Sequence, residues 1–242
     1  MAEDPNLFPN PCAPDPLARP LVIVGIGDFP RLLHYYLRED DPRQVVAFSV
    51  DRDFLPTGAD GTFSASFDGL PLVPFDMLPA MFPPSQYDVL LGMGYSRMNE
   101  NRRRKFLECK GMGYRIASYF HSSCSIHTKD IGEGNIMLER CLVYPFSKIG
   151  DGNLMFDTVN VSHDSVVGSF NFFAGGTDLC GFCEIGDNCF FGKGSVLDEH
   201  FKAADYTLVG AGAYARGETE PYDVIVPQRS VRLNGHKSTD FR

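Results

Sequence analysis

One apolar or small residue recurs every six positions from Ile131 to Ala215, and the register never slips. A pure period of six fits neither an α-helix, whose period is 3.6, nor a flat strand, whose period is two. It fits a chain that turns a corner every six residues and climbs as a triangular parallel β-helix, three hexads per coil. The pattern predicts about five coils, with these fifteen side chains pointing inward: Ile131, Met137, Val143, Ile149, Met155, Val161, Val167, Phe173, Leu179, Ile185, Phe191, Leu197, Ala203, Val209 and Ala215. Many hexads continue with glycine, which is expected to suit strained backbone at the corners.

Small residues fill the position two before each inward residue, where the chain is expected to turn. Cys141, Cys183 and Cys189 are among them. Cys180-x-x-Cys183 together with Cys189 raises the alternative of a zinc site, but a closed site needs a fourth ligand that the spacing does not supply. The cysteine count of seven is odd, and nothing favours secretion, so free thiols are expected. We interpret the three cysteines as structural and predict no metal.

Length and composition bound the class of protein. The 242 residues suffice for one large or two small domains, and a 43% hydrophobic content is ordinary for a globular chain. The net charge of −9 argues against a general nucleic-acid role. No apolar stretch is long enough to span a bilayer, and the N-terminus lacks a signal-peptide pattern. We therefore expect a cytoplasmic protein without a nucleic-acid or membrane partner.

Four segments differ in pattern. Residues 1–20 carry six prolines and predict an extended arm. Residues 21–120 alternate short apolar runs with helical stretches, which predicts a small, Rossmann-like parallel sheet. Residues 121–217 hold the β-helix, and residues 218–242 form a C-terminal tail, whose basic part Pro221–Arg242 is expected to pack back on it. The predicted fold class is thus α/β plus all-β.

Within the second segment, apolar runs predict strands at Leu21–Val24, Val45–Val50, Val89–Leu91 and Tyr114–Ala117. Helices are expected over 31–38 and 99–110, and residues 54–84 read as a segment rich in proline and glycine.

The turn after the first predicted strand is a candidate phosphate site. Gly25-Ile26-Gly27-Asp28 would place backbone N–H groups and a helix N-terminus near a phosphate, although Pro30 replaces the third glycine of the dinucleotide fingerprint. Asp51, at the end of the second strand, is placed to reach a ribose hydroxyl or a base. A tight turn and a solvated loop aspartate remain the alternatives.

His163 is the candidate catalytic base. It follows the inward residue Val161 by two positions, so it is expected outside the prism near a corner. Imidazole is the side chain best suited to accept a proton near neutral pH, and the neighbouring Asp164 could orient the ring. The alternative is a solvated surface histidine.

The chain resembles the sugar acyltransferases with a left-handed β-helix, and most closely the family of sialic acid O-acetyltransferases and bacillosamine-pathway N-acetyltransferases. The resemblance covers about residues 20–216. It rests on the Gly25-x-Gly27 turn, the Gly69-Leu70-Pro71-Leu72 stretch followed by Asp76 and Leu78, Gly92-x-Gly94, and His121 at the domain junction. Most specific is His163-Asp164-x-x-x-Gly168, followed at the family's spacing by Gly176, Gly181, Gly186, Gly192, Gly210 and Gly212.

The resemblance implies direct transfer from acetyl-CoA, the cosubstrate, in a homotrimer whose active sites lie between subunits. His163 would be the base, Asp164 its support and Gly181 N–H the oxyanion donor. The pantetheine arm would run along Gly192, Gly210, Ala211 and Gly212. Candidate partners of the CoA phosphates are Lys193, Arg216, Arg229 and Arg232. The N-terminal domain would hold the nucleotide of a nucleotide-linked sugar, through Gly25, Gly27, Asp28, Asp51 and Gly94.

Three positions depart from the family pattern. Phe172, preceded by Asn171, stands where many relatives carry a second histidine that contacts the sugar, so both residues are candidate substrate contacts. The terminal turn reads 225–229 Ile-Val-Pro-Gln-Arg, so the adenine end of the CoA site is expected to differ. Asp198-Glu199-His200 occupies a corner where relatives often carry proline, and it either positions substrate or is solvated polar surface.

The favoured function is therefore N-acetylation of an amino group on a nucleotide-linked deoxyamino sugar. O-acetylation of a free sugar such as a sialic acid is the runner-up, and a catalytically silent β-helix scaffold is a third possibility. A metal enzyme of the γ-class carbonic anhydrase kind needs three converging histidines, whereas only His163 and His200 lie in the regular coils.

Overall fold

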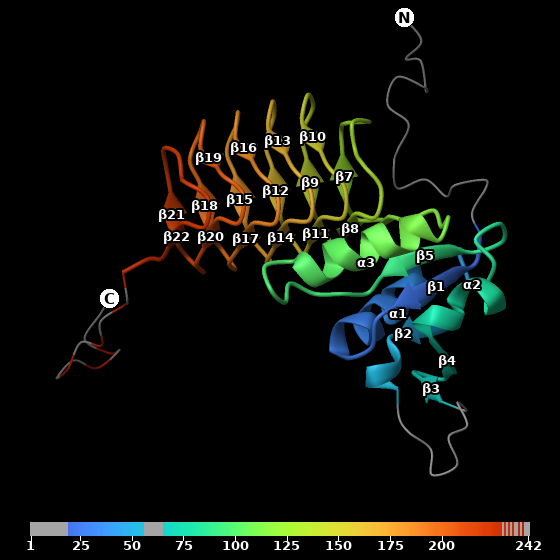
Figure 1. The fold of residues 1–242 in the computed structure, drawn as a ribbon. Coiled ribbons are helices and arrows are strands. Elements are labelled where there is room, and N and C mark those ends of the chain that lie inside the picture. The colour runs from blue at the N-terminus through green and yellow to red at the C-terminus, as the bar shows by residue number, and fades with distance from the viewer. Residues whose placement is uncertain are drawn as a thin grey trace, which may run out of the picture.

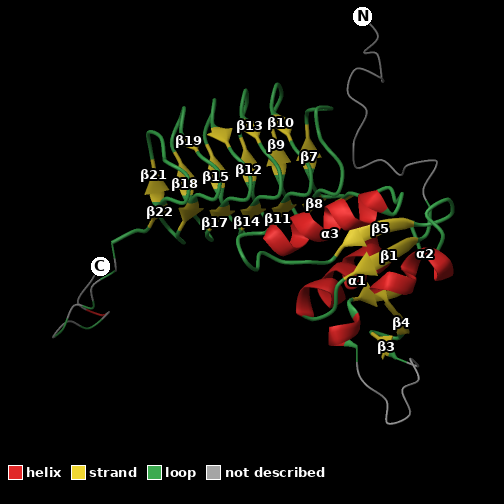
Figure 2. Ribbon diagram, viewed as in Figure 1, coloured by secondary structure: helices red, strands yellow, loops and turns green. Residues whose placement is uncertain are grey.

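Two structural parts follow one another along the chain. The computed structural model describes residues 19–55 and 65–228, together with positions 230, 232, 234, 237 and 239. An α/β domain comes first, and a parallel β-helix runs from β6 to β22, with α3 lying between the two (Figure 1). The helices α1 to α3 belong to the first part, and the prism consists of short strands and turns (Figure 2). The proposed arm at 1–20 falls almost entirely outside the described residues.

The α/β domain is built on a five-stranded sheet with the order β3-β4-β2-β1-β5. The strands are β1 (Leu21–Val24), β2 (Val45–Val50), β3 (Ser66–Phe67), β4 (Leu70–Pro74) and β5 (Asp88–Leu91). The helices are α1 (Asp28–Asp40), α2 (Leu78–Met81) and α3 (Glu100–Gly111), with 3-10 turns η1 (Arg52–Phe54) and η2 (Phe75–Met77). Three of the four pairings are parallel, and only β3–β4 is antiparallel.

One expected strand was wrong. Tyr114–Ala117 contributes a single bridge, Val89 to Ile116, and no full strand. The fourth strand of the parallel set is β4, inside the segment that the sequence marked as rich in proline and glycine. Pro71 pairs with Ser66 of β3, at the sheet edge, where a missing N–H is tolerated.

The prism has three faces, which we name after one strand each. The β8 sheet contains β6 (Tyr119–Phe120), β8 (Ile136–Met137), β11 (Leu154–Met155), β14 (Phe172–Phe173), β17 (Phe190–Phe191), β20 (Leu208–Val209) and β22 (Val224–Ile225). The β9 sheet contains β7 (Ser125–Ile126), β9 (Leu142–Val143), β12 (Asn160–Val161), β15 (Asp178–Leu179), β18 (Val196–Leu197) and β21 (Tyr214–Ala215). The β10 sheet contains β10 (Lys148–Ile149), β13 (Val166–Val167), β16 (Glu184–Ile185) and β19 (Lys202–Ala203).

The prism is longer than the hexad array at both ends. Before Ile131, each strand pairs with the strand seventeen residues later instead of eighteen, as Ser125 does with Leu142. The strict six-residue period therefore did not predict these first strands. After Ala215 the strand β22 adds a rung that the sequence assigned to the tail. The described positions beyond β22 are exposed, and Val226 and Pro227 among them lie beside Gly210 of the prism.

The inward side chains are as predicted. Met137, Phe173 and Leu179 are fully buried, and among the fifteen only Ile131 is less than buried. The reason given for the corner glycines was wrong, however. Gly150 has no positive φ; instead, a Cβ there would lie 2.7 Å from the carbonyl oxygen of Gly168 in the next coil. These glycines therefore allow close stacking of coils, whereas the left-handed corner positions carry residues such as Phe170 and Asn188.

The corner slot is a buried column whose polar atoms tie successive coils together. Asn135 Oδ1 accepts from the backbone N–H of Asn153 at 2.8 Å, and Asn153 Oδ1 accepts from that of Asn171 at 2.9 Å. Cys183 and Cys189 are free thiols in this column, and burial raises the pKa of each to about 12. Their structural role is confirmed, since a thiol so buried and so weakly acidic is unreactive.

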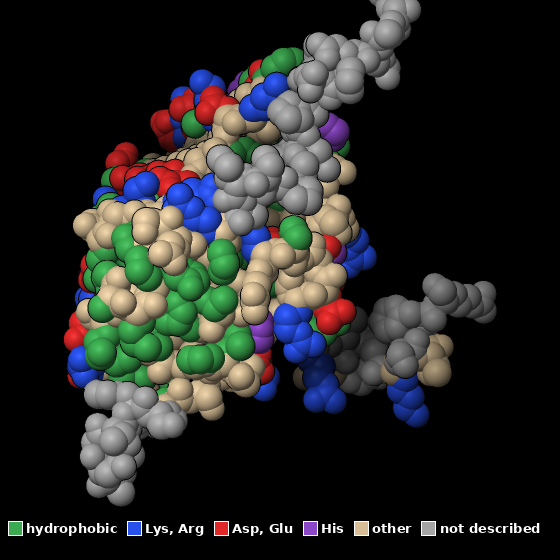
Figure 3. Space-filling view, turned by 90° about the vertical axis from the view of Figure 1, so that its right-hand side faces the viewer, with side chains coloured by type: hydrophobic (Ala, Val, Ile, Leu, Met, Phe, Trp, Pro, Cys, Tyr) green, Lys and Arg blue, Asp and Glu red, His purple; other side chains and the backbone are tan. Residues whose placement is uncertain are grey.

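The α/β domain sits on the β8 sheet. One face of its own sheet packs with α1 onto Ile136, Leu154 and Phe172, and the other face is covered by α2 and α3. Tyr36 of α1 donates to Glu139 at 2.8 Å, on one edge of the β8 sheet. On the side that corresponds to the right of Figure 1, hydrophobic side chains gather on the surface (Figure 3).

Candidate active site

His163 lies at the corner between the β9 and β10 sheets, on the turn that joins β12 to β13. Its Nδ1 lies 3.0 Å from Asp164 Oδ2, and both side chains are nearly half exposed. Asp164 has a φ of 57°, a left-handed corner conformation that asparagine and aspartate tolerate better than most residues. If the carboxylate accepts from Nδ1–H, the lone pair of Nε2 is free to accept a proton, which is the arrangement of a general base.

Gly181, one coil further on, lies directly against the imidazole. A Cβ at Gly181 would lie 2.9 Å from Cε1 and 3.1 Å from Nε2 of His163. Among the described residues, the Gly181 N–H donates no hydrogen bond, while its carbonyl accepts from His200 N–H. An unused backbone donor beside the free nitrogen of a base is what stabilisation of an oxyanion requires.

The sequence missed a residue that fixes the imidazole. Phe182 meets the ring of His163 edge-on, with centroids 5.1 Å apart, and it stacks on His200 at 4.9 Å. His200, an undecided candidate from sequence, is thus connected to the base through Phe182 and through its N–H bond to Gly181. Phenylalanine periodicity gave no signal for this role, because Phe182 occupies a corner position rather than an inward one.

We expect Gly181→Ala to lower activity far more than stability. Gly181 has no positive φ, so the backbone tolerates alanine, but the new methyl group must displace the imidazole of His163. A misplacement of about 1 Å can cost ~10²-fold in rate. Gly111→Ala is the matched control, since nothing lies within 4 Å of a Cβ there. Thiol release and thermal unfolding would be measured for both, and equal activity of the two variants would contradict the placement of Gly181.

The outward face of the β9 sheet carries further polar groups that sequence did not single out. Asn160 Nδ2 donates to Asp178 Oδ1 at 2.6 Å, while Asn160 Oδ1 is buried with no partner among the described residues. Further along the sheet, a hydrogen bond from Tyr214 lowers the pKa of Asp198. This face therefore presents hydrogen-bonding groups beside His163.

Five predicted cofactor residues lie at the opposite edge of the β9 sheet, between it and the β8 sheet: Gly192, Lys193, Gly210, Ala211 and Gly212. Gly192 faces the next coil, where a Cβ would meet the backbone N of Ala211, so its first role is coil stacking. Gly212 has open space around it, and Lys193 is exposed. Arg216 and Arg232 are also exposed, whereas Arg229 lies outside the described residues.

The predicted nucleotide residues gather at the carboxyl ends of β1, β2 and β5. Gly25, with φ of 127°, approaches Gly92 so closely that a Cβ would lie 2.5 Å from its carbonyl oxygen, whereas Gly27 and Gly94 face open space. The Asp28 side chain is fully exposed. Asp51 is not free: its Oδ1 is 2.5 Å from Nζ of Lys105 on α3.

The adjacent candidates Asn171 and Phe172, at the start of β14, do not form a polar sugar contact. Asn171 is fully buried; its Nδ2 donates to Gly186 O at 2.9 Å and its Oδ1 accepts from Cys189 N at 2.7 Å. The prediction that Asn171 contacts substrate is therefore corrected, because both ends of the amide are used by the coil column. Phe172 is 5% exposed and lies under the α/β domain.

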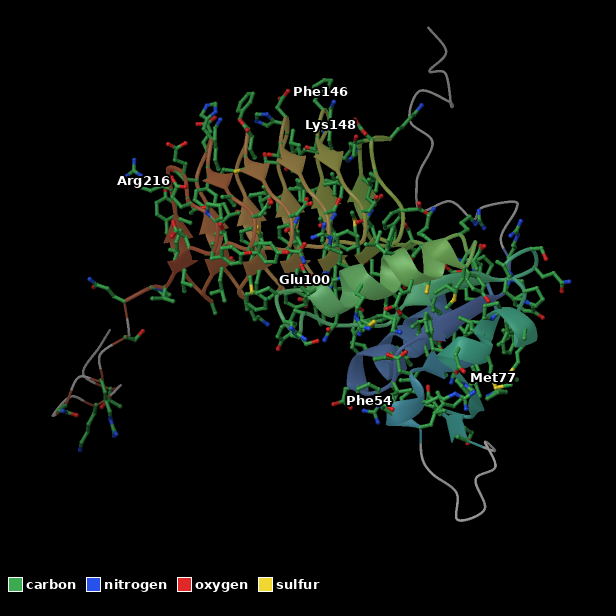
Figure 4. All side chains as sticks on the ribbon, viewed as in Figure 1. Phe54, Met77, Glu100, Phe146, Lys148 and Arg216 are labelled. Carbon is green, nitrogen blue, oxygen red and sulfur yellow. The ribbon has the colours of Figure 1, made fainter. Side chains whose placement is uncertain are left out.

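The structure does not bring the two halves of the predicted site together within one chain. The α/β domain covers the β8 sheet, and the His163 corner is the one opposite that sheet. Phe146, one coil before Asp164 at the same corner, projects away from α3, as the labels of Phe146 and Glu100 show (Figure 4).

Comparisons with solved structures find the same architecture in an acetyltransferase domain, in a GDP-perosamine N-acetyl transferase and in the protein WeeI. The acetyltransferase domain of PglB from Neisseria gonorrhoeae superposes with a TM-score of 0.73 at 19% identity, over 86% of this chain and 97% of that one. A mutant of GDP-perosamine N-acetyl transferase from Caulobacter crescentus, in complex with CoA and GDP-perosamine, gives 0.73 at 20% identity, over 86% and 93%. WeeI from Acinetobacter baumannii gives 0.61 at 19% identity, over 85% and 93%.

These likenesses confirm the predicted fold class, a small Rossmann-like domain followed by a left-handed parallel β-helix. No protein-family pattern matches the sequence, and no curated protein does. In the part of the chain that the structure describes, no helix has the length and apolar character to cross a membrane. Nor do three or more His, Cys, Asp or Glu side chains converge there as metal ligands would.

Proposed function

We propose that this protein is an acetyl-CoA-dependent sugar N-acetyltransferase acting on an amino group of a nucleotide-linked deoxyamino sugar. The observation that carries the proposal is the contact of Gly181 with the His163 imidazole, whose other nitrogen faces Asp164. The fold supports it, since the Neisseria PglB domain has been solved with acetyl coenzyme A and the Caulobacter enzyme with CoA and GDP-perosamine.

In the proposed reaction the sugar nitrogen attacks the thioester carbonyl carbon of acetyl-CoA. His163 Nε2 takes the proton that the nitrogen loses, and Asp164 holds the ring through Nδ1 and stabilises its positive charge. The Gly181 N–H stabilises the oxyanion, a contribution of about 3 kcal/mol for such a donor. When the C–S bond breaks, the proton on His163 passes to the departing thiolate, which leaves an amide and free CoA.

The proposal is tested by thiol release from acetyl-CoA with a panel of UDP-, dTDP- and GDP-linked amino sugars. We expect turnover of one amino sugar and none of its hydroxyl counterpart. Turnover of a free sialic acid instead would favour the O-acetyltransferase. Binding of acetyl-CoA without any turnover would favour the scaffold.

We further propose that each active site is shared between two copies of the chain in a homotrimer. The separation of the His163 corner from the glycine turns within one chain supports this, because a neighbouring prism could present its histidine to the α/β domain. Acetyl-CoA would then lie between prisms, along the β9 sheet and its edge at Lys193 and Gly212.

Mixing two inactive variants tests the shared site. Gly94→Asp adds a carboxylate in open space at the proposed diphosphate site, without positive φ to strain it, and His163→Ala removes the base. Copies co-expressed with different tags should regain activity, because random assembly restores about a quarter of the sites. Activity that stays at the level of the single variants would mean that both halves act within one chain.

A further inference from the structure

Two cysteines occupy the same place in the first two coils of the prism. Ser125 of β7 pairs with Leu142 of β9, so Cys124 and Cys141, which precede them, are neighbours in successive coils. The N–H of Ser125 donates to the carbonyl of Cys141 at 3.0 Å, which continues the parallel ladder to this position. Neighbouring parallel strands lie about 4.8 Å apart, and disulfides join residues whose Cα atoms are about 4.4–6.8 Å apart. The backbone spacing therefore suits a disulfide.

Both thiols point into the corner slot. Cys141 Sγ donates to the carbonyl of Phe156, fifteen residues ahead, at 3.0 Å. Cys124 Sγ donates to the carbonyl of Leu138, fourteen residues ahead, at 3.0 Å, and the difference is the one residue by which the first coil is shorter. The two side chains thus have the same orientation, and their thiol groups share a hydrogen bond.

The two thiols differ in access and in acidity. Cys141 is 1% exposed, whereas Cys124 is only partly buried and precedes β7, the terminal strand of the β9 sheet. Hydrogen bonds from the side chain and the backbone of Cys141 lower the pKa of the Cys124 thiol. The hydrogen bond with Cys124 and burial raise the pKa of the Cys141 thiol. An accessible, more acidic thiol beside a buried one is the arrangement of an attacking and a resolving cysteine.

The remaining described cysteines lack this combination. Cys109, Cys183 and Cys189 are fully buried, and burial raises the pKa of each to about 12. Cys180 is partly exposed, but burial raises the pKa of its thiol as well. Among the six described cysteines, Cys124 is therefore the one at which partial exposure coincides with a lowered pKa.

We propose that Cys124 and Cys141 are a redox-modification site, at which a small disulfide such as glutathione disulfide oxidises the pair to a disulfide that joins the first two coils. The Cys124 thiolate attacks one sulfur of the small disulfide, so its S–S bond breaks, a mixed disulfide forms and one thiol leaves. Cys141 Sγ then attacks Cys124 Sγ, and its proton passes to the second thiol as that thiol departs. Two protein thiols are oxidised, and one small disulfide is reduced to two thiols.

Peptide mapping tests the site without requiring turnover. Trypsin cleaves after lysine and arginine, which places Cys124 in the peptide 116–129 and Cys141 in the peptide 141–148, with no other cysteine in either. The full-length reduced protein would be incubated with glutathione disulfide, its remaining thiols alkylated, and the digest analysed by mass spectrometry. We expect the two peptides to become joined at least about tenfold faster than any other cysteine is modified, and dithiothreitol to separate them.

Serine variants distinguish the two roles. Serine is compatible with the corner slot, since Ser147 and Ser165 occupy it elsewhere in the prism and are buried there. Cys141→Ser should retain a mixed disulfide with glutathione on Cys124, whereas Cys124→Ser should leave Cys141 reduced. Cys180→Ser is the matched control, because Cys180 is also partly exposed, and it should form the joined peptides as the wild type does.

Three results would overturn the inference. The first is the absence of joined peptides in the wild type, or their appearance only after other cysteines are modified. The second is oxidation of Cys141 in the Cys124→Ser variant, because Cys124 would then not be the attacking thiol. The third is a cross-link confined to dimers on a non-reducing gel, because the bond would then join two copies of the chain.

Discussion

His163→Ala should lower thiol release from acetyl-CoA at least ~10²-fold while leaving acetyl-CoA affinity and thermal stability nearly unchanged. The imidazole is the proposed proton acceptor, and its Nδ1 lies 3.0 Å from the carboxylate oxygen of Asp164 that is proposed to support it. The side chain is 47% exposed, so its removal leaves no cavity in the core.

His127→Ala is the control for this experiment. His127 is exposed and follows β7 at the same corner two coils earlier, but the seventeen-residue offset puts it in register with Tyr144 and Ser162 instead of His163. We expect the His127→Ala variant to be as active as the wild type. If His163→Ala retains more than about a tenth of the activity, the base is another group, and the proposed mechanism is wrong.

Arg102→Met should destabilise the protein by about 3 kcal/mol or more, the largest stability effect that we expect from a single polar side chain. Arg102 is 1% exposed, and its guanidinium donates only to uncharged oxygens. Burial lowers its pKa to about 9, so it remains protonated at neutral pH. Its acceptors join three parts of the chain: Gly94 O at 2.8 Å, Gly152 O at 2.9 Å, Asn171 O at 3.0 Å, Asn99 Oδ1 at 3.1 Å and Phe170 O at 3.2 Å.

Two effects of the substitution oppose each other. Methionine removes the cost of burying a charge, which by itself favours the variant. It also leaves several buried oxygens without this donor, at about 1–3 kcal/mol each, and this second effect is the larger. Urea unfolding would measure the difference, with Arg103→Met as control, because the Arg103 side chain is 40% exposed. Coincident unfolding curves for the two variants would show that Arg102 does not join the domains.

The six-residue period predicted most of the prism, because every inward position must hold an apolar or small side chain that fits inside a coil. It failed at Ser125, where one coil is a residue shorter, and at β22, where the inward residue follows an exposed loop. It also could not reveal β4, because Pro71 and Pro74 are typical of a loop and only the pairing with β2, which includes Val50 with Pro74, shows that the segment is a strand.

Part of the candidate active site could be predicted from the same repeat. His163 and Gly181 are eighteen residues apart, which is one coil, so the repeat itself places one above the other. The contact between Tyr95 and Phe172 could not be predicted, because the two residues are 77 positions apart and no sequence period connects them. Asn171 was misassigned, since the sequence cannot tell an exposed amide from one used inside a coil column.

The sequence by itself determined the β-helix, its inward residues and the corner that carries His163, because these depend on a local repeat that imposes the same contacts on each coil. Only the tertiary structure decided how the α/β domain sits on the β8 sheet, which aromatic rings meet beneath its glycine turns, and that His163 faces away from them. Those features depend on contacts between segments far apart in the chain, such as Arg102 with Gly152, and no local pattern encodes them.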